Sequence, residues 1–417
     1  MARFSEHESP ARRLPMVALL SANAVSMTGN ATANVAIPWF VLQTTGSAAK
    51  TGLAFAAISL SNVLAAFFGA PVVDRLGYRR LSVLADVLSG VAVALVPLLY
   101  WTVGLWFWQL LVLVFVGGIL DAPGATARQS MLPALAEGAA MPKERANSAF
   151  FAVSQVSDFV GLSAGGVLVA TVGATGVLWI NAATFAVSAA IVALGVPASG
   201  PMVSASRRRI WPRSYFAELR EGLEFIRGEG LVRVICAAAV AFNLLAIPLL
   251  MVVMAVYADR LFEDASSFGF LLGAFAGGTL LSGAAFGAFG HRLPRRTVFS
   301  LAVAARWLPI WALLFSPSLP VSVAALAVAG LANGPIDPLI YTSIQERTPR
   351  GLLARVNGAS LALARGAAPV GAALAGWALG AFGLQPVLLA IAAGLLVVSL
   401  ALVSSPALRE MDAKGGR

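Results

Sequence analysis

Cysteine, histidine and charged residues are all scarce in this sequence. The single cysteine, Cys236, excludes an intramolecular disulfide framework and any multi-cysteine metal site. The two histidines, His7 and His291, fall in the polar N-terminus and in a predicted loop, so we predict no metal centre. Charged residues make up 12% of the chain, whereas soluble proteins carry roughly 25%.

Hydrophobic residues dominate instead, at 59% of the chain with a mean hydropathy of +0.84. A soluble protein of 417 residues could not bury that much apolar surface in its core. A bilayer core needs about 20 apolar residues per helix, and the backbone in lipid must satisfy its own hydrogen bonds. We therefore predict an all-α integral membrane protein with twelve transmembrane helices, at about 14–42, 48–73, 79–101, 105–131, 146–172, 176–196, 232–257, 266–290, 296–316, 320–343, 355–380 and 384–405.

The positive charges predict the orientation in the membrane. Of the 29 lysines and arginines, 25 fall at the N-terminus, in the even-to-odd connections, at the adjoining helix ends or at the C-terminus. Lys50 and Arg260 lie on the other side, and Arg306 and Arg365 lie inside predicted spans. The positive-inside rule then places both termini in the cytoplasm, in a multi-pass protein of the inner membrane. Because topology explains the net charge of +10, we expect no nucleic-acid partner.

The chain also contains an internal repeat. His291 lies 217 residues after Asp74 in a similar charged hairpin, and Asp337 lies 216 residues after Asp121. We predict an N-terminal six-helix bundle (1–197), a cytoplasmic linker (198–231) and a C-terminal six-helix bundle with a short tail (232–417). Two related six-helix halves are a transporter architecture, with the binding site between them. The linker should form an amphipathic helix on the inner membrane face, because its apolar residues recur at helical spacing: Phe216, Leu219, Leu223 and Ile226.

The first hairpin carries a family resemblance. Its sequence, APVVDRLGYRR at 70–80, resembles the loop signature GxxxDRxGRR of the major facilitator superfamily, with Ala70 and Tyr78 as departures. The segments PWFVLQTTGSA, VLADVLSGVAVALVP and DAPGATARQSMLP are similar to actinobacterial Tap-type multidrug efflux proteins. The resemblance covers nearly the whole chain. It implies a drug:proton antiporter that exports compounds such as tetracyclines and aminoglycosides.

The resemblance also implies two structural motifs. The hairpin would lock the two halves together in the outward-facing state, since a carboxylate can cap a helix N-terminus and arginines can pair across the gap. A run GLSAGG resembles the fifth-helix antiporter signature GPxxGG, and small residues at this spacing also allow close helix packing. The predicted conformational motif is Asp74, Arg75, Gly77, Arg79, Arg80 and Asp86, and the predicted helix-packing motif is Gly161, Gly165 and Gly166.

Three carboxylates are candidates for proton coupling. An ionisable group inside a membrane span is costly, so each is a candidate functional residue. Asp158 lies near the middle of the fifth predicted helix, where burial disfavours the charged form and allows proton exchange at working pH. Asp121 and Asp337 occupy equivalent places in the two halves. A structural hydrogen bond is the alternative for all three.

Polar residues of the first helix predict a wall of the substrate cavity. Asn23, Ser26, Asn30 and Asn34 form one stripe, which would be costly against lipid. Helix-packing hydrogen bonds are the alternative. Arg306 and Arg365 need a compensating partner in the membrane and could bind an anionic substrate group, although an ion pair is equally consistent. The predicted substrate-binding residues are Asn23, Asn30, Asn34, Asn181, Asn243, Tyr341, Arg306 and Arg365.

These observations predict a transporter rather than an enzyme. The sequence has no Walker A loop, and its GLSAG run at 161–165 lies inside a predicted apolar helix rather than at the strand-to-helix turn of a GxSxG elbow. We therefore expect a proton gradient to supply the energy, with no cofactor. The predicted function is export of amphipathic small molecules in exchange for protons, by a monomer in the lipid bilayer. The alternatives are a dedicated exporter of one metabolite or siderophore, a nutrient importer of the same fold, and a membrane enzyme or receptor.

Overall fold

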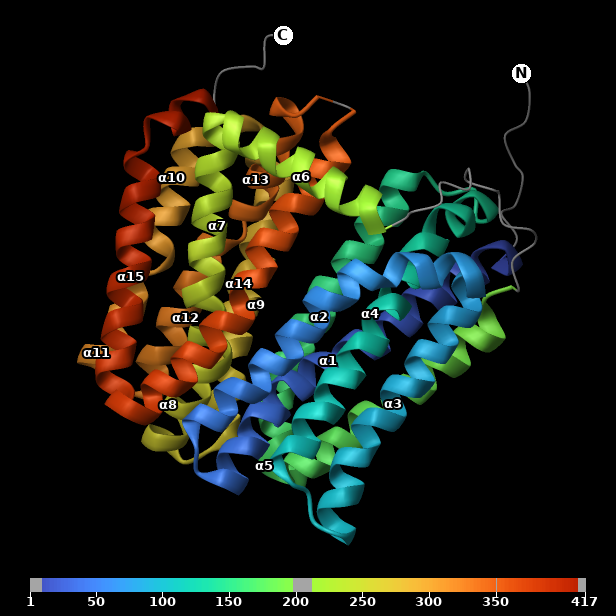
Figure 1. The fold of residues 1–417 in the computed structure, drawn as a ribbon, viewed down its shortest axis with the longest axis horizontal. Helices are drawn as coiled ribbons and strands as arrows, with labels where there is room; N and C mark the ends of the chain where they lie inside the picture. The colour runs from blue at the N-terminus through green and yellow to red at the C-terminus, as the bar shows by residue number, and fades with distance from the viewer. Residues whose placement is uncertain (1–9, 198–211, 350, 412–417) are drawn as a thin grey trace. The chain divides into compact units, whose positions relative to one another are not determined.

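A computed structural model describes residues 10–197, 212–349 and 351–411 (Figure 1). Throughout these ranges the chain is helix or short connection, without a strand. The side chains of 10–12, 66–76 and 212–216 lie outside the description. The first half consists of α1 (Pro10–Thr45), α2 (Ala48–Leu76), α3 (Tyr78–Thr102), α4 (Phe107–Gly138) and α5 (Lys143–Gly195).

The second half contains more and shorter helical segments. They are α6 (Pro212–Gly228), α7 (Gly230–Pro248), the π-helix η1 (Leu249–Val253), α8 (Met254–Phe262), α9 (Ala265–Phe289), η2 (Gly290–Arg292), α10 (Arg295–Arg306), η3 (Leu308–Trp311), α11 (Ala312–Phe315), α12 (Leu319–Asn333), α13 (Ile336–Arg347), α14 (Leu353–Phe382), α15 (Leu384–Ser404) and η4 (Pro406–Met411). The all-α membrane architecture predicted from the sequence is confirmed.

The helices are consistent with the predicted twelve spans. Ten helical stretches within the described ranges are long and apolar enough to cross a membrane. One of them, α5, has 53 residues and a non-helical break at Gly173 (φ 76°, ψ 162°), a left-handed conformation that favours glycine. It therefore contains two of the predicted spans. The remaining span is α1, whose 36 residues include the polar stripe that lowers its hydropathy.

Three of the predicted spans in the second half are interrupted. The span 230–262 passes from α7 through Pro248 into the π-helix η1 and then α8. The span that starts with α10 changes to the 3₁₀ segment η3 after Arg306. Gly334 and Pro335 separate α12 from α13. Proline removes a backbone donor and clashes with the preceding turn, which explains why a helix changes its geometry beside it.

The chain divides into two compact units. Unit 1 consists of Met1–Ala31, Leu64–Gly161 and Leu178–Arg207, and unit 2 of Thr32–Val63, Leu162–Val177 and Arg208–Arg417. Close glycine contacts explain why two segments from the first half belong to unit 2. A Cβ atom added at Gly52 of α2 would lie 2.7 Å from the Cα of Gly376, and one at Gly166 of α5 would lie 2.6 Å from the Cα of Gly269.

The linker helix α6 packs on protein. It lies beside α7 and α14 within unit 2 (Figure 1). Leu219, Leu223 and Ile226, three members of its predicted apolar stripe, join a cluster with Val232, Cys236, Ile344, Val356 and Ala359. Glu221 on the same helix forms an ion pair with Arg355 of α14. This packing explains the amphipathic pattern that the sequence assigned to the membrane face, although the side chain of Phe216 lies outside the described part of the chain.

Candidate functional site

Unit 1 contains a buried ion pair between α3 and α4. Nη1 of Arg128 lies 2.7 Å from Oδ1 of Asp86, and the two side chains are 1% and 0% exposed. Ser188 donates a hydrogen bond to the other oxygen of Asp86 at 2.7 Å. Arg128 also donates to Asn23 Oδ1 and Ser26 Oγ of α1, each at 3.3 Å. These partners compensate both charges, as a buried ion pair requires.

Asp121 lies on the same face of α4 as Arg128, two turns before it. Nδ2 of Asn30 donates a hydrogen bond to its Oδ2 at 2.9 Å. Its other oxygen, Oδ1, is buried and has no hydrogen-bond partner among the described residues. Buried polar atoms are nearly always hydrogen-bonded, so this oxygen has room for a partner that the chain itself does not supply. A water molecule would supply that partner, and the same oxygen is available to take up a proton.

Asp158 lies on α5, and no charged side chain of the described residues pairs with it. Its side chain is half-buried, and in the described part of the chain it forms no hydrogen bond or ion pair. The adjacent Ser157 donates to the carbonyl of Ala24 at 3.3 Å, which holds this turn of α5 against α1. The absence of a fixed partner leaves this carboxylate chemically available.

The predicted polar stripe of α1 supplies much of this network. Asn23 is 1% exposed and also donates to Ser154 Oγ at 3.4 Å, while Asn34 is half-buried farther along the helix. Asn181 is 1% exposed, and its Oδ1 accepts a hydrogen bond from Thr184 at 3.3 Å. Hydrogen bonds between helices therefore engage Asn23 and Asn30, and a local bond engages Asn181.

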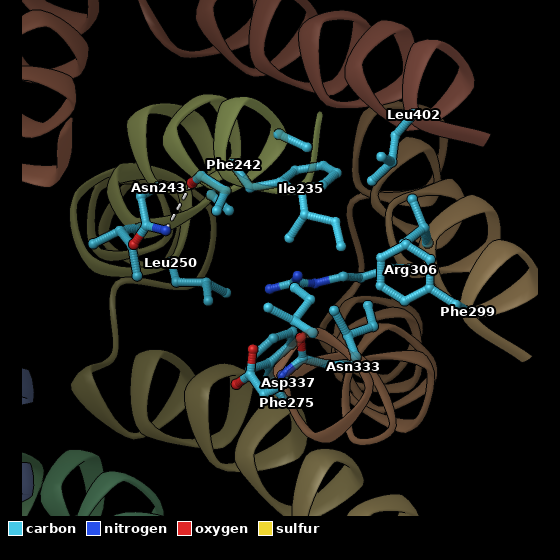
Figure 2. A pocket seen from close by; sticks show the side chains of 17 residues that line it. Ile235, Phe242, Asn243, Leu250, Phe275, Phe299, Arg306, Asn333, Asp337 and Leu402 are labelled. Atoms are coloured by element: carbon cyan, nitrogen blue, oxygen red, sulfur yellow. Dashed lines mark hydrogen bonds between the residues drawn. The ribbon is translucent and has the colours of Figure 1, made fainter. Parts of the chain in front are cut away.

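Unit 2 contains a partly open cavity of about 280 Å³ (Figure 2). Most of its lining is aliphatic or aromatic, and Phe242, Leu250 and Phe275 are among the larger side chains. Four polar side chains complete the lining: Asn243, Arg306, Asn333 and Asp337. An apolar cavity with a few converging polar groups is the usual form of a small-molecule site.

Arg306 extends across this cavity (Figure 2). Its guanidinium carbon lies 4.4 Å from the ring centroid of Trp307 and 5.8 Å from that of Phe242, so both rings provide cation–π contacts. Its Nε is buried without a hydrogen-bond partner, and no carboxylate of the described chain pairs with it. The aromatic contacts and the charge of Asp337 on another wall of the cavity stabilise the guanidinium, whose donors have no hydrogen-bond partner among the described residues.

The three helix interruptions of unit 2 all reach this cavity. Leu250 of η1, Arg306 at the end of α10, and Asn333 and Asp337 on either side of the α12–α13 break are lining residues. Asp337 lies in the first turn of α13, where the helix macrodipole favours negative charge. In membrane proteins irregular backbone is tolerated where it is buried in protein or lines a cavity, and broken helices commonly form transporter binding sites.

Other residues predicted for the substrate site lie elsewhere. Tyr341 is 52% exposed on α13, and Arg365 is exposed on α14; neither lines the cavity. Asn243 does line it, but its Nδ2 donates to the carbonyl of Ala239 on its own helix at 2.8 Å. The structure therefore brings Asn243, Arg306 and Asp337 together.

The predicted conformational motif is described in part. Gly77 forms the turn between α2 and α3 with φ 76°, which explains why glycine stands there. Arg79 donates to the carbonyl of Ala193, and Arg80 is exposed. Asp86 forms its ion pair with Arg128. The side chains of two further members, Asp74 and Arg75, lie outside the described residues.

The three glycines of the predicted packing motif all face neighbouring helices. A Cβ atom at Gly161 would lie 2.5 Å from the Cβ of Ala31, and one at Gly165 would lie 3.1 Å from Cγ2 of Val35. Gly166 meets Gly269 of α9. A side chain at Gly161 or Gly166 would displace the adjacent helix.

Sequence reasoning missed Arg128. It lies three residues from the end of the predicted span 105–131, so it was counted among the cytoplasmic helix ends. The signal that could have identified it is its spacing, since a residue seven positions after Asp121 shares the same helix face. A basic residue on the face of an intramembrane carboxylate is a candidate for pairing.

Comparisons with known proteins agree with this architecture. The family model of the Major Facilitator Superfamily matches residues 19–261 and 236–415. The chain is 35% identical over 405 residues to the "Multidrug efflux pump Tap" of Mycobacterium tuberculosis (strain ATCC 25618 / H37Rv), covering 96% of this chain and 95% of that protein. It is 32% identical over 406 residues to the protein of the same name from Mycolicibacterium fortuitum, covering 96% and 98%.

Solved structures show the same fold at low sequence identity. The nucleoside transporter NupG superimposes with a TM-score of 0.71 at 13% identity, over 93% of this chain and 98% of that one. A D-xylose-proton symporter has a TM-score of 0.67 at 13% identity, over 93% and 96%. At these identities the likeness concerns the fold alone.

Proposed function

The chain belongs to the major facilitator superfamily, and from that premise we propose that it exports amphipathic small molecules, drugs among them, in exchange for protons. It is a multi-pass membrane transporter of small molecules rather than an enzyme. The observation that carries the proposal is the 35% identity over 96% of the chain to a protein named as a multidrug efflux pump. A relationship of that extent includes both halves of the transporter.

The carboxylates inside the predicted spans support the proton-coupling part of the proposal. Both oxygens of Asp86 have partners in Arg128 and Ser188, so this carboxylate is engaged in holding α3, α4 and α5 together. Asp121 has an unpartnered oxygen, and Asp158 has no partner in the described chain. These two carboxylates, with Asp337 in the second half, are the proposed proton carriers, and the proton gradient is the proposed energy source without a cofactor.

In this mechanism, the transporter alternates between states open to either side of the membrane. Protons would bind from outside and be released into the cytoplasm, while the drug moves in the opposite direction. The distribution of basic residues supports an inner-membrane protein with both termini in the cytoplasm. We propose that one chain suffices as the transporting unit.

Drug uptake into inverted membrane vesicles tests this function. With an imposed gradient, acid inside, vesicles containing the wild-type protein should accumulate tetracycline, because protons leaving the lumen drive the drug inward. Asp121→Asn and Asp158→Asn remove one carrier each, and Asp337→Asn tests the second half. Glu224→Gln, on the exposed face of α6, is the matched control and should transport normally.

The pattern of losses identifies the carrier. Abolished uptake in Asp121→Asn or Asp158→Asn, with normal uptake in Glu224→Gln, assigns coupling to that carboxylate. Abolished uptake in Asp337→Asn assigns coupling to Asp337 only if that variant still binds the drug, because Asp337 also lines the cavity of unit 2. Gradient-driven uptake retained in all three variants would contradict coupling through these residues. No gradient-dependent movement of tetracycline or of other amphipathic drugs by the wild type would contradict multidrug export and favour a dedicated substrate.

A further inference from the structure

We propose that the cavity of unit 2 binds zwitterionic compounds with an aromatic body, with Arg306 holding the anionic group and Asp337 the cationic group. This inference deepens the proposed function, on which it rests for the transport of what is bound. It assigns a substrate class to a largely apolar cavity that contains one positive and one negative side chain.

Arg306 is suited to an anion because its donors have no fixed partner. Its guanidinium is stabilised by two aromatic rings rather than by a carboxylate. A planar guanidinium forms paired hydrogen bonds with a carboxylate, and these charge-assisted bonds are stronger than neutral ones. A ligand carboxylate would also give the buried Nε the side-chain partner that it lacks in the described chain.

Asp337 provides the opposite charge on another wall of the same cavity. It lies at the start of α13, directly after the break at Gly334 and Pro335, and it has no hydrogen-bond or ion-pair partner among the residues described. The residue is exposed and lines the cavity, so its carboxylate is open to a ligand. A ligand ammonium group can bind there without displacing an existing partner.

The remaining lining favours an aromatic or aliphatic body between the two charged groups. Phe242 and Phe275 provide ring faces, and Leu250 and Ile340 provide aliphatic surface. A cavity of about 280 Å³ is just below the usual range for ligand sites, roughly 300–1,000 Å³. It therefore fits a small molecule, or the charged end of a larger one.

Arg306 and Asp337 act on each other electrostatically but share no hydrogen bond or ion pair among the described contacts, which explains why a zwitterion should bind better than an ion of one sign. A purely anionic ligand would meet Arg306 but bring a like charge close to Asp337, and a purely cationic ligand would do the reverse. A neutral ligand would leave both groups unpartnered and exclude water from them, which carries a desolvation cost. Only a ligand with both charges matches both groups.

Binding of four indole compounds to the purified full-length protein tests this assignment. Tryptophan is zwitterionic, tryptamine cationic, indole-3-propionate anionic and 3-methylindole neutral, and all share one ring system. Equilibrium dialysis with labelled compounds gives each dissociation constant. We expect tryptophan to bind at least about tenfold tighter than the other three, the size of effect typical for a hydrogen bond to a charged group.

Charge variants then assign each group. Arg306→Gln should remove the advantage of tryptophan over tryptamine, and Asp337→Asn should remove its advantage over indole-3-propionate. Arg306→Lys keeps the charge and should restore part of the affinity, which separates binding from misfolding. Arg220→Gln and Glu224→Gln alter an exposed pair on α6 and should leave the preference unchanged.

Three results would overturn the assignment: no binding of tryptophan to the wild type, no preference among the four compounds, or a preference that survives both Arg306→Gln and Asp337→Asn. The vesicle assay fails independently of this one. If the wild-type protein showed no gradient-driven drug uptake but still preferred tryptophan, the proposed function would be contradicted and the assignment of the binding site would stand.

Discussion

At the scale of single residues, the intramembrane charges differ in how completely they are partnered. Arg128 and Asp86 hold each other and contact three neutral side chains. Among the described residues, Asp121 keeps one oxygen without a partner, and Arg306 has ring contacts and the nearby charge of Asp337 but no ion pair. We infer that the first pair maintains the structure of unit 1, whereas the incompletely partnered groups take part in proton and substrate binding.

Replacing Arg128 with methionine should strongly destabilise the protein. Asp86 would remain buried at 0% exposure without its ionic partner, and breaking a buried pair in this way costs about 3–5 kcal/mol. The melting temperature of the purified protein in detergent should therefore fall.

Two further variants test the reason for that loss. The double variant Arg128→Met/Asp86→Leu removes both charges and should recover much of the stability. Arg220→Met, whose pair with Glu224 is 81% and 57% exposed, should cost less than about 1 kcal/mol. A melting temperature of Arg128→Met equal to that of the wild type would show that the buried pair has no stabilising role.

At the scale of helices, the repeat places equivalent glycines in equivalent contacts. Gly269 lies 217 residues after Gly52, and Gly376 lies 210 residues after Gly166. The contacts Gly52–Gly376 and Gly166–Gly269 are therefore two copies of one interaction, with the roles of the halves exchanged. Both require a backbone approach that any side chain would prevent.

Gly166→Ala should lower stability, although alanine usually favours a helix by about 1 kcal/mol over glycine. The added methyl group would lie 2.6 Å from the carbonyl oxygen of Ala265, and overpacking of this kind costs about 1–3 kcal/mol. Gly376→Ala should have the same effect by the repeat. Gly366→Ala, on α14 with no atom within 4 Å of the added Cβ, is the control. Equal melting temperatures of the three variants would refute the packing role of Gly166 and Gly376.

The docking of α6 can be followed through the single cysteine. Cys236 is 4% exposed beneath the apolar face of α6. A Cβ atom at Gly222 would lie 2.5 Å from the carbonyl oxygen of Arg355, so Gly222→Val should push α6 away from α14. Maleimide labelling of Cys236 should then be about tenfold faster or more, the change that follows when the docked state of α6 loses about 1.4 kcal/mol. Gly228→Val, where nothing lies within 4 Å, should label as slowly as the wild type. Equal labelling of Gly222→Val and the wild type would mean that α6 does not protect the thiol.

At the scale of the whole molecule, hydropathy and charge were sufficient to predict the helical membrane architecture, because lipid permits few alternatives. The Asp74–Arg80 hairpin and the segment around Asp121 were sufficient to identify the family, which the comparisons confirm. The repeat also predicted that Asp121 and Asp337 occupy equivalent positions. The domain boundaries at 197 and 232 and the roles of the site residues stay predictions.

The partners of the charged residues could not be predicted from the sequence. Pairing depends on which helix faces meet, so Asp86 was assigned to the hairpin, whereas its partner is Arg128. The cavity depends on three helix interruptions, at Pro248, after Arg306 and at Gly334–Pro335. Proline marks sites where a helix can break, but only the packing decides that three such sites surround one space. For the same reason, the sequence grouped Tyr341 and Arg365 with residues that they do not join.

The direction of proton movement during drug efflux tests the central claim most directly. Proteoliposomes would be loaded with tetracycline and a pH-sensitive dye, without a pH gradient, and diluted into drug-free buffer. The dye signal of protein-free liposomes treated in the same way would be subtracted. Exchange of drug for protons predicts that the lumen acidifies as tetracycline leaves, and that Asp121→Asn or Asp158→Asn reduces this signal. Alkalinisation would indicate cotransport, and drug efflux without any pH change would indicate uniport; either result would contradict proton-coupled export.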